Sequence, residues 1–359
     1  MYYEMPVRVY EEENCVLNHS GQLGALGKKA LIVTGRHSAK VNGSLKDVTD
    51  ALEKEGVKYA VFDEIEENPS VETIMNGRER GIAENADFVI GIGGGSPLDA
   101  AKAIAFMIYH REKDASYLYE DDGNSEALPV AAVPTTCGTG SEVTSISVLT
   151  RREKETKASI PHHIFPEIAL IDAVYLRNAS QKIIRNTAVD ALCHLCESWI
   201  NVKANDFSRM FVSAGLKIWR RSRDVLLGKK EAEKEDLRNL MRASTLAGMA
   251  ISHTGTSLAH GLSYAVTYET GMPHGKAAGY FLPGFLRESD DENVAYLMRE
   301  SGFRSIEDLR EFYGIVCREA VISPEILEKT VQSLLKNPAK LKSFPYPANE
   351  AVLRRIAGI

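Results

Sequence analysis

The sequence predicts an α/β N-terminal domain with a mostly parallel sheet, followed by an all-α C-terminal domain. Short β-branched runs alternate with polar amphipathic segments from residue 28 to about residue 173, the pattern of strand–helix units around a parallel sheet. Beyond residue 178, apolar residues recur every three or four positions, the period of an amphipathic helix. Because 359 residues exceed one ordinary core, we expect two domains, residues 1–178 and 179–359.

The strands are predicted where apolar or β-branched residues follow one another directly. Several of these runs are apolar throughout, as expected for strands that are covered on both faces. The predicted strands are residues 30–34, 59–62, 88–92, 130–133, 146–149 and 168–171.

The C-terminal half is predicted to be helical, with helices at residues 186–202, 207–219 and 243–266. Two glycine- and proline-containing segments interrupt this pattern, GMPHG at 271–275 and LPG at 282–284. Glycine and proline favour turns, so we expect both segments to break helices.

Composition and charge exclude several classes of protein. The formal net charge is −6 and there is no long basic run, which argues against a nucleic-acid partner. The sequence has neither the ~20 consecutive apolar residues of a membrane-spanning helix nor a recognisable secretory signal. Five cysteines at low density argue against a disulfide framework and for a reducing compartment. We expect a cytoplasmic protein with small-molecule partners.

A glycine-rich turn, GIGGGSPLD at residues 91–99, leads from a predicted strand into a predicted helix. Glycines let a ligand approach the backbone closely. Ser96 is expected to cap the helix and Asp99 to act as the capping-box acid. Free N–H groups and the helix dipole would then favour a phosphate or pyrophosphate. The alternative is a tight strand-to-helix turn without a ligand. The motif also differs from the usual dinucleotide fingerprint, because it follows the third predicted strand rather than the first.

A second polar loop, PTTCGTGSE at residues 134–142, follows the next predicted strand. Its hydroxyls are suited to contact phosphate, ribose or an amide. Alternatively, they satisfy only their own backbone, which is a common use of Thr and Ser. The two loops support each other, because neighbouring parallel strands end at the same edge of a sheet.

Four residues of the helical half form a candidate metal site. Asp190 and His194 are four positions apart in a predicted helix, so they share one face. His260 lies in a later predicted helix and His274 in the GMPHG turn. One carboxylate with three imidazoles suits Fe(II) or Zn(II) better than Mg(II) or Ca(II). Such spacing also arises by chance, so the residues alone leave metal binding open.

Other possible metal donors are given structural interpretations. Cys193 and Cys196 point away from the face that carries Asp190 and His194, and are interpreted as core residues. His253 is seven residues before His260, two turns along one predicted helix, and is a candidate to line the same pocket. The predicted surface histidines are His162 and His163, and those without a partner at ligand spacing are His19, His37 and His110.

With these motifs, the chain resembles the iron-containing (group III) alcohol dehydrogenase family, which is related in fold to glycerol dehydrogenase and dehydroquinate synthase. GGGSPLDAAK at 93–102 resembles the family's dinucleotide loop, and residues 134–142 resemble its second cofactor loop. The resemblance implies an α/β dinucleotide-binding domain and an all-α metal-binding domain. The implied metal ligands, also the catalytic residues, are Asp190 in AVDAL, His194, His260 in LAHGL and His274 in HG. The nucleotide contacts predicted from the loops and the resemblance are Gly35, Ser38, Asn68, Gly93, Gly94, Gly95, Ser96, Asp99, Thr135, Thr136, Thr139, Ser141 and Lys157.

Two positions depart from the family pattern. Many relatives carry a further histidine four residues after the third ligand, proposed to help proton transfer, whereas this chain has Tyr264. Some relatives carry an acid after the first strand that contacts the ribose 2′-hydroxyl, whereas this chain has Gly35, Arg36, His37 and Ser38. We therefore predict NADP(H) in preference to NAD(H).

The resemblance implies reversible hydride transfer between a nicotinamide cofactor and a small alcohol or aldehyde, with one divalent metal, Fe(II) or Zn(II). Relatives are often dimers or larger, so a homo-oligomer is expected. The alternatives are a lyase resembling dehydroquinate synthase and a non-catalytic nucleotide- or metal-binding protein.

Overall fold

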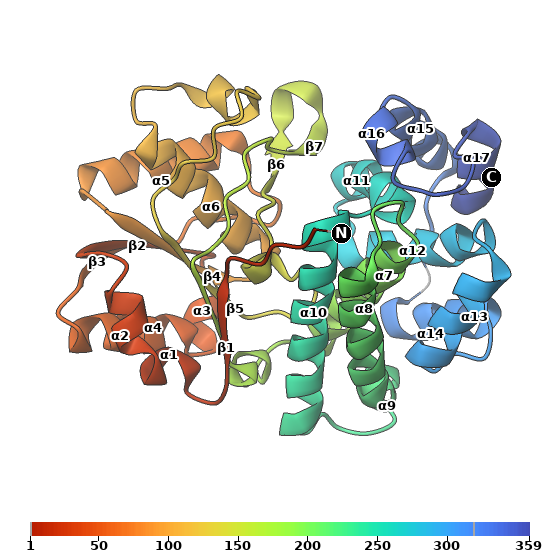
Figure 1. Cartoon of the computed structure of the whole chain (residues 1–359), viewed down its shortest axis with the longest axis horizontal. Coiled ribbons are helices and arrows are strands. Elements are labelled where there is room, and N and C mark those ends of the chain that lie inside the picture. The colour runs from red at the N-terminus through yellow and green to blue at the C-terminus, as the bar shows by residue number, and fades with distance from the viewer. Residues whose placement is uncertain (1, 319) are drawn as a thin grey trace. The chain divides into compact units, whose positions relative to one another are not determined.

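A computed structural model describes residues 2–318 and 320–359. The chain divides into two compact units (Figure 1). The sheet unit contains Met5–Thr136 and Gly140–Ala179. The helical unit contains Cys137–Thr139 and Ser180–Ile359, together with the residues up to Glu4. Three residues of the second polar loop therefore belong to the helical unit.

The sheet unit is built on one parallel sheet with the strand order β1-β8-β5-β4-β2-β3. In the register, Ala30 lies opposite Phe88, and Val89 lies opposite Val130. The strands are β1 (Arg8–Glu11), β2 (Lys29–Thr34), β3 (Lys58–Phe62), β4 (Phe88–Gly93), β5 (Val130–Pro134) and β8 (Ile168–Ile171).

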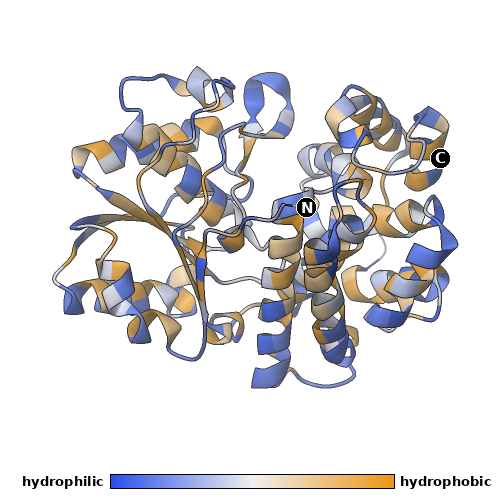
Figure 2. Ribbon diagram, viewed as in Figure 1, coloured by the Kyte–Doolittle hydropathy of each residue, from blue (hydrophilic) through white to orange (hydrophobic). Residues whose placement is uncertain are grey.

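Helices cover both faces of this sheet. Leu31 and Val33 of β2 belong to a core shared with α5 and α6, whereas Ala30 and Ile32 belong to a core shared with α1 to α4. This alternation follows the two-residue period of a strand, and Figure 2 shows the strands as mainly hydrophobic. The helices are α1 (Cys15–Asn18), α2 (Ser20–Gly24), α3 (Ser38–Val41), α4 (Ser44–Lys54), α5 (Val71–Ala83) and α6 (Gly95–Tyr109).

The strand predictions for the main sheet are confirmed except at residues 146–149. Those residues run into β6 (Val148–Arg151), which pairs with β7 (Thr156–Ser159) in a separate antiparallel hairpin. The sixth strand of the main sheet is instead β1, which was not predicted. Its sequence, RVYE, has a charged residue at each end, and the strand pairs with β8 alone among the described strands, so it lacks the apolar run of a central strand.

The helical unit confirms the predicted all-α half, because its described residues from Ser180 onward form helices and connecting segments. None of the described helices is long and apolar enough to cross a membrane. The helices are α7 (Gln181–Trp199), α8 (Asp206–Trp219), α9 (Arg223–Leu227), α10 (Lys234–Thr254), α11 (Leu258–Thr270), α12 (His274–Arg287), α13 (Asp291–Ser301), α14 (Ile306–Cys317), α15 (Pro324–Leu335), α16 (Pro338–Leu341) and α17 (Glu350–Ala357). Short 3₁₀ helices occur in both units. The sheet unit contains η1 (Ala115–Tyr119), η2 (Ser141–Val143), η3 (Arg152–Lys154) and η4 (Ala173–Leu176), and the helical unit contains η5 (Arg220–Ser222).

Two predictions about helix ends are wrong. The segment 243–266 is not one helix, because the chain leaves α10 at Gly255, which has a φ of +71°, and restarts at Leu258. Conversely, residues 282–284 do not break a helix but lie inside α12. Tertiary packing accounts for the second error: a Cβ on Gly284 would lie 2.4 Å from the carbonyl oxygen of Ile356 in α17, so glycine allows close contact between the two helices.

We predict that Gly284→Ala lowers the free energy of unfolding by about 1–3 kcal/mol, because the added methyl group would meet backbone atoms of α17. Gly314→Ala is the matched control, since Gly314 lies inside α14 and an added Cβ would meet no described atom within 4 Å beyond its neighbours and its own helix backbone. This control should raise the stability by up to about 1 kcal/mol. Urea denaturation of both variants measures the difference, and equal stabilities would contradict the packing argument.

Candidate functional site

Helix α7 presents three polar side chains on one buried face. Asp190, His194 and Glu197 are spaced at i, i+4 and i+7, positions that lie above one another on a helix. Their exposed fractions are 4% or less. The helix begins at a capped end, because the Ser180 hydroxyl accepts a hydrogen bond from the backbone N–H of Ile183.

The beginnings of α11 and α12 bring two histidines to this face. His260 is the third residue of α11, and His274 is the first residue of α12. A Cβ on Gly275 would lie 2.1 Å from the carbonyl oxygen of Asn186 and 2.7 Å from the Cβ of Asp190. Only glycine at this position allows the start of α12 to pack so closely on α7, and this packing places His274 beside Asp190.

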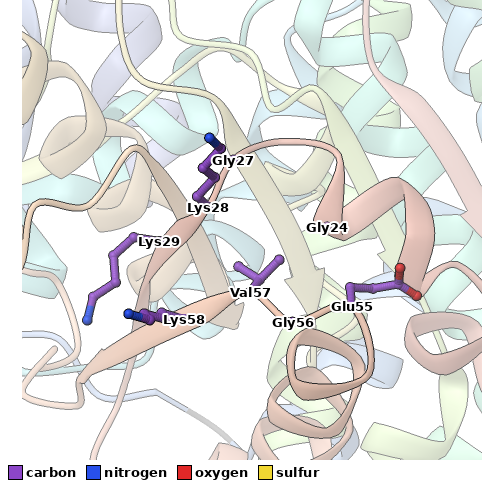
Figure 3. A pocket seen from close by; sticks show the side chains of 8 residues that line it. All are labelled: Gly24, Gly27, Lys28, Lys29, Glu55, Gly56, Val57 and Lys58. Atoms are coloured by element: carbon purple, nitrogen blue, oxygen red, sulfur yellow. The ribbon is translucent and has the colours of Figure 1, made fainter.

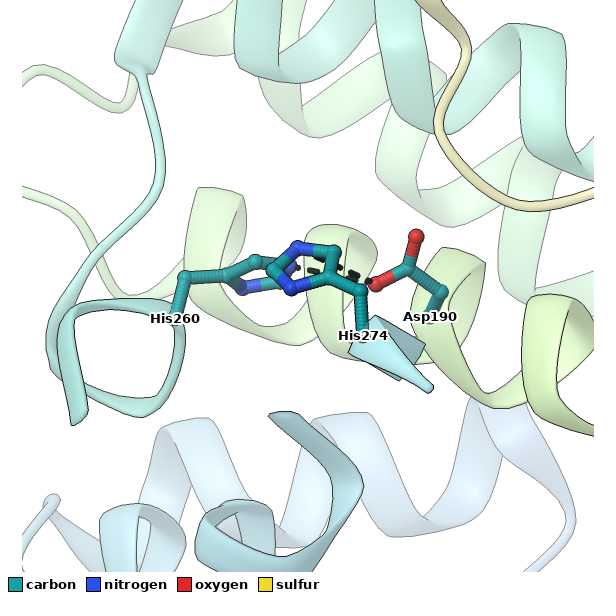
Figure 4. A group of neighbouring side chains, drawn as sticks. All are labelled: Asp190, His260 and His274. Carbon is teal, nitrogen blue, oxygen red and sulfur yellow. Dashed lines mark hydrogen bonds and ion pairs between the residues drawn. The ribbon is translucent and has the colours of Figure 1, made fainter. Parts of the chain in front are cut away.

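Asp190, His260 and His274 point toward one another (Figure 4). The Nε2 atoms of His260 and His274 lie 3.3 Å and 3.9 Å from the same carboxylate oxygen, Oδ1 of Asp190. One ligand atom from each of the three residues lies within 4.8 Å of the others. These three predicted ligands therefore converge on one place.

The fourth predicted ligand, His194, lies against the same group. Its ring stacks on that of His260, with 4.3 Å between the ring centroids and an angle of 12° between the planes. Its Nδ1 is 3.2 Å from the carbonyl oxygen of Gly138. Because a carbonyl oxygen only accepts hydrogen bonds, this contact places the proton on Nδ1 and leaves the Nε2 lone pair of His194 available.

The charges of the site suit a cation. Burial alone would raise the pKa of Asp190, but His194, His274 and His260 hold it below its usual value. Burial and the nearby His260 lower the pKa of His194 to about 4. Burial would also lower the pKa of His260, but Glu197 and Asp190 raise it to about 9. An ionised carboxylate and imidazole nitrogens are the donors that Fe(II) and Zn(II) accept, so the residues fit a divalent ion.

The other donors lie elsewhere. Cys193 and Cys196 are buried in the core, as predicted, and burial raises the pKa of both thiols.

The prediction that His253 lines the same pocket is wrong, because the chain turns between α10 and α11 and His253 Nε2 instead contacts the side chain of Asn205. His162 is not a surface residue either. It is 2% exposed, and its ring stacks on Phe106 of α6.

The first predicted nucleotide loop lies at the carboxyl end of β4. Gly93 has a φ of +150°, in the range that favours glycine, and a Cβ there would lie 2.5 Å from Pro97. Helix α6 already begins at Gly95, and its N-cap residue is Gly94. The prediction that Ser96 caps the helix is therefore wrong, and its hydroxyl instead accepts a hydrogen bond from the Asn68 backbone N–H. With no side-chain cap, the first N–H groups of α6 are suited to an anion.

The second predicted loop follows β5, the neighbour of β4 in the sheet. Both loops therefore leave the same edge of the sheet, as predicted. Thr135 donates its backbone N–H to Gly93, and a Cβ on Gly94 would lie 2.9 Å from the Thr136 hydroxyl. Thr139, also predicted, belongs to the helical unit.

A buried lysine joins the two loops. Lys102 of α6 is 0% exposed, and its ammonium donates hydrogen bonds to the Ser141 hydroxyl at 2.7 Å and the Ile146 carbonyl at 2.8 Å. Ser141 in turn donates to Asp99 at 2.5 Å, and Asp99 also accepts the backbone N–H of Val148. The prediction that Asp99 acts as a capping-box acid is therefore wrong. Its carboxylate is instead part of this network.

Two further groups of predicted residues lie near these loops. Lys157 donates a hydrogen bond to the Asn68 side chain at 2.5 Å, and the Asn68 backbone contacts Ser96, so three predicted contacts form one cluster. Gly35 directly follows β2, the other neighbour of β4, and Ser38 lies three residues further along the chain. Ser38 is exposed, at the first position of α3.

A surface pocket at the opposite ends of the strands contains three lysines, Lys28, Lys29 and Lys58 (Figure 3). These residues precede or begin β2 and β3. Ligands of parallel sheets bind outside the carboxyl ends of the strands, so this pocket is not interpreted as the nucleotide site.

Sequence reasoning missed Glu197 and Lys102. A signal existed for each, because Glu197 follows His194 by three positions and Lys102 follows Asp99 by three positions, so each pair shares a helix face. The residue that Glu197 would meet, His260, lies in another helix, and nothing in the spacing identifies it.

Comparisons with known proteins identify the family of the chain. A family model described as "Iron-containing alcohol dehydrogenase" matches residues 6–173, and the model of the C-terminal part of the same family matches residues 184–308. Long-chain-alcohol dehydrogenase 1 of Geobacillus thermodenitrificans is 30% identical over 93% of this chain and 89% of its own length. The NADPH-dependent butanol dehydrogenase of Clostridium saccharobutylicum is 30% identical over 89% of this chain and 81% of its own length.

Solved structures show the same relationship. An iron-containing alcohol dehydrogenase from Thermotoga maritima superposes with a TM-score of 0.92 at 35% identity, over 100% of this chain and 99% of that one. Matches of this extent in sequence and fold show that the chain belongs to the iron-containing alcohol dehydrogenase family, and that it is a metal-dependent alcohol dehydrogenase.

Proposed function

We propose that this enzyme transfers hydride reversibly between NADP(H) and a small alcohol or aldehyde, with residues 1–178 binding the nucleotide and residues 179–359 holding the metal and substrate. The convergence of Asp190, His260 and His274 on one point, with His194 beside them, carries the proposal. The C. saccharobutylicum relative is named a butanol dehydrogenase and an Escherichia coli relative a lactaldehyde reductase. We therefore propose a short primary alcohol or aldehyde as the substrate.

Asp190, His194, His260 and His274 would hold one divalent ion, Fe(II) or Zn(II), because the donor set accepts both. Such an ion supplies Lewis-acid chemistry to the substrate oxygen. The carboxylate of Asp190 contributes the negative charge of the ligand set, and the buried imidazoles of His194 and His260 restrict access of water to this carboxylate. Tyr264, which stands where many relatives carry a histidine, lies beside the ring of His274, with 5.9 Å between the centroids.

The nucleotide would bind at the edge of the sheet where β2, β4 and β5 end. Pyrophosphate suits the uncapped start of α6. The adenosine ribose would lie near Gly35 and Ser38, where Arg36 and His37 are exposed and no acid follows β2 directly. Asp63, at the end of the adjacent β3, is already paired with Lys40 at 2.6 Å. These charges support a 2′-phosphate, and hence NADP(H).

We also propose that the enzyme is a homodimer of the cytoplasm. Its five cysteines are free and buried, as suits a reducing compartment.

The metal assignment predicts that activity is lost on metal removal and restored by Fe(II) or Zn(II). The test is anaerobic NADPH and NADH oxidation with short aldehydes, using protein stripped by a chelator and then reloaded. His274→Ala should reduce both metal content and kcat/KM, the latter by at least about 100-fold, because a Lewis acid contributes several kcal/mol.

His253→Ala is the matched control for this experiment. His253 is also helical and partly buried, but it contacts Asn205 outside the site. We expect metal content and kcat/KM of this variant to stay close to those of the wild type. Full activity of metal-depleted protein would refute the metal assignment.

The loop network predicts that Lys102→Met weakens nucleotide binding by about 10- to 100-fold, because hydrogen bonds of a charged group contribute about 1.5–3 kcal/mol and Lys102 connects α6 to the second loop through Ser141 and Ile146. Metal content should not change. Lys46→Met, which removes an exposed lysine paired with Asp50 of the same helix, is the control. Titration of protein fluorescence with NADPH measures both dissociation constants, and equal values would contradict the role of Lys102.

The proposed cofactor preference is tested by the ratio of kcat/KM for NADPH and NADH. We expect the ratio to exceed one in the wild type and to fall by about tenfold or more in Arg36→Glu, since one opposed charge contact contributes on the order of 1–2 kcal/mol. A strong preference of the wild type for NADH would refute the proposal.

A further inference from the structure

We propose that Glu197 is a positioning residue of the metal centre, which fixes the orientation and tautomer of His260. This inference rests on the proposed metal site. It concerns a residue that would not touch the ion itself but would act through one of its ligands.

Both carboxylate oxygens of Glu197 contact His260. Oε1 accepts the backbone N–H of His260 at 3.0 Å, and Oε2 accepts a hydrogen bond from the ring Nδ1. The exposed fractions of the two side chains are 0% for Glu197 and 1% for His260. Two contacts from one carboxylate fix both the start of α11 and the plane of the imidazole ring, without competition from water.

The contact at Nδ1 determines which nitrogen remains for a ligand. An ionised carboxylate can only accept a hydrogen bond, so the proton of the ring lies on Nδ1. Nε2 then keeps its lone pair, and Nε2 is the atom that faces Oδ1 of Asp190 at 3.3 Å. With the ring rotated or in the other tautomer, His260 would present a C–H or N–H group to Asp190 and His274 instead.

The negative charge of Glu197 adds a second effect. A carboxylate hydrogen-bonded to the distal nitrogen makes an imidazole a more basic ligand, and loss of such partners typically weakens metal binding by about 10- to 100-fold. A purely structural role is the competing explanation, because the contact with the backbone N–H also satisfies a first-turn donor of α11. The two explanations differ in whether the charge of residue 197 affects the metal.

Glu197→Gln separates these explanations, because it keeps the size of the side chain and one acceptor but removes the charge. The dissociation constant for Zn(II) is measured on the full-length protein by competition with a chromogenic chelator. We expect Glu197→Gln to bind Zn(II) about 10- to 100-fold more weakly than the wild type, with nucleotide affinity unchanged. A purely structural role would lower the melting temperature without this loss of metal affinity.

Ser198→Ala is the matched control on the same helix. Ser198 is equally buried and accepts a hydrogen bond from Thr254 at 3.0 Å, away from His260. We expect its Zn(II) affinity to stay within about threefold of the wild type. If Glu197→Gln binds Zn(II) as tightly as the wild type, the inference is overturned while the proposed function stands. If the wild type itself binds no Zn(II) or Fe(II), both are overturned.

A measurement on the wild type alone keeps the test independent of variant folding. The ¹⁵N chemical shifts and ring-proton couplings of labelled histidines in the Zn(II) protein report which nitrogen carries the proton. For His260 we expect a proton on Nδ1. A proton on Nε2 would overturn the inference, whatever the variants do.

Discussion

Buried ionisable groups need partners, and in the helical unit this requirement determines how α7, α11 and α12 pack. Asp190 and Glu197 are almost completely buried on one face of α7, and an unpaired carboxylate there would be strongly destabilising. His260 contacts both of them, from a helix that begins only two residues earlier. The same contacts that stabilise the fold therefore bring together residues of the proposed metal site.

The sheet unit meets the same requirement with a lysine. Lys102 is fully buried, and it is compatible with the core because Ser141 and Ile146, which follow β5, accept its hydrogen bonds and Asp99 of α6 lies 3.6 Å from its ammonium. Burial lowers its pKa, which the Asp99 and Glu142 carboxylates oppose. The loops are thus held by a group inside the protein, and the backbone N–H groups at the start of α6 are left for a ligand.

Features that depend on the spacing of residues close together in the sequence could be predicted, and features that depend on contacts between distant elements could not. Asp190 and His194 follow from a four-residue spacing on one helix, and the central strands follow from their apolar runs. The assignments of Ser96 and His253 failed because helix ends shifted: α6 begins at Gly95, and Gly255 divides α10 from α11. Glu197 was missed because its partner, His260, is 63 positions away in the sequence.

An imidazole has two nitrogens, and the chain uses Nδ1 of both His194 and His260 for contacts within the protein. The acceptor for His194 is a neutral carbonyl, that of Gly138, whereas the acceptor for His260 is the ionised carboxylate of Glu197. Burial and the nearby His260 lower the pKa of His194 to about 4, whereas Glu197 and Asp190 outweigh burial and raise the pKa of His260 to about 9. The two stacked rings thus present the same nitrogen, but in the proposed metal site they would not be equivalent ligands. His260, whose partner carries the charge, would be the stronger donor of the two.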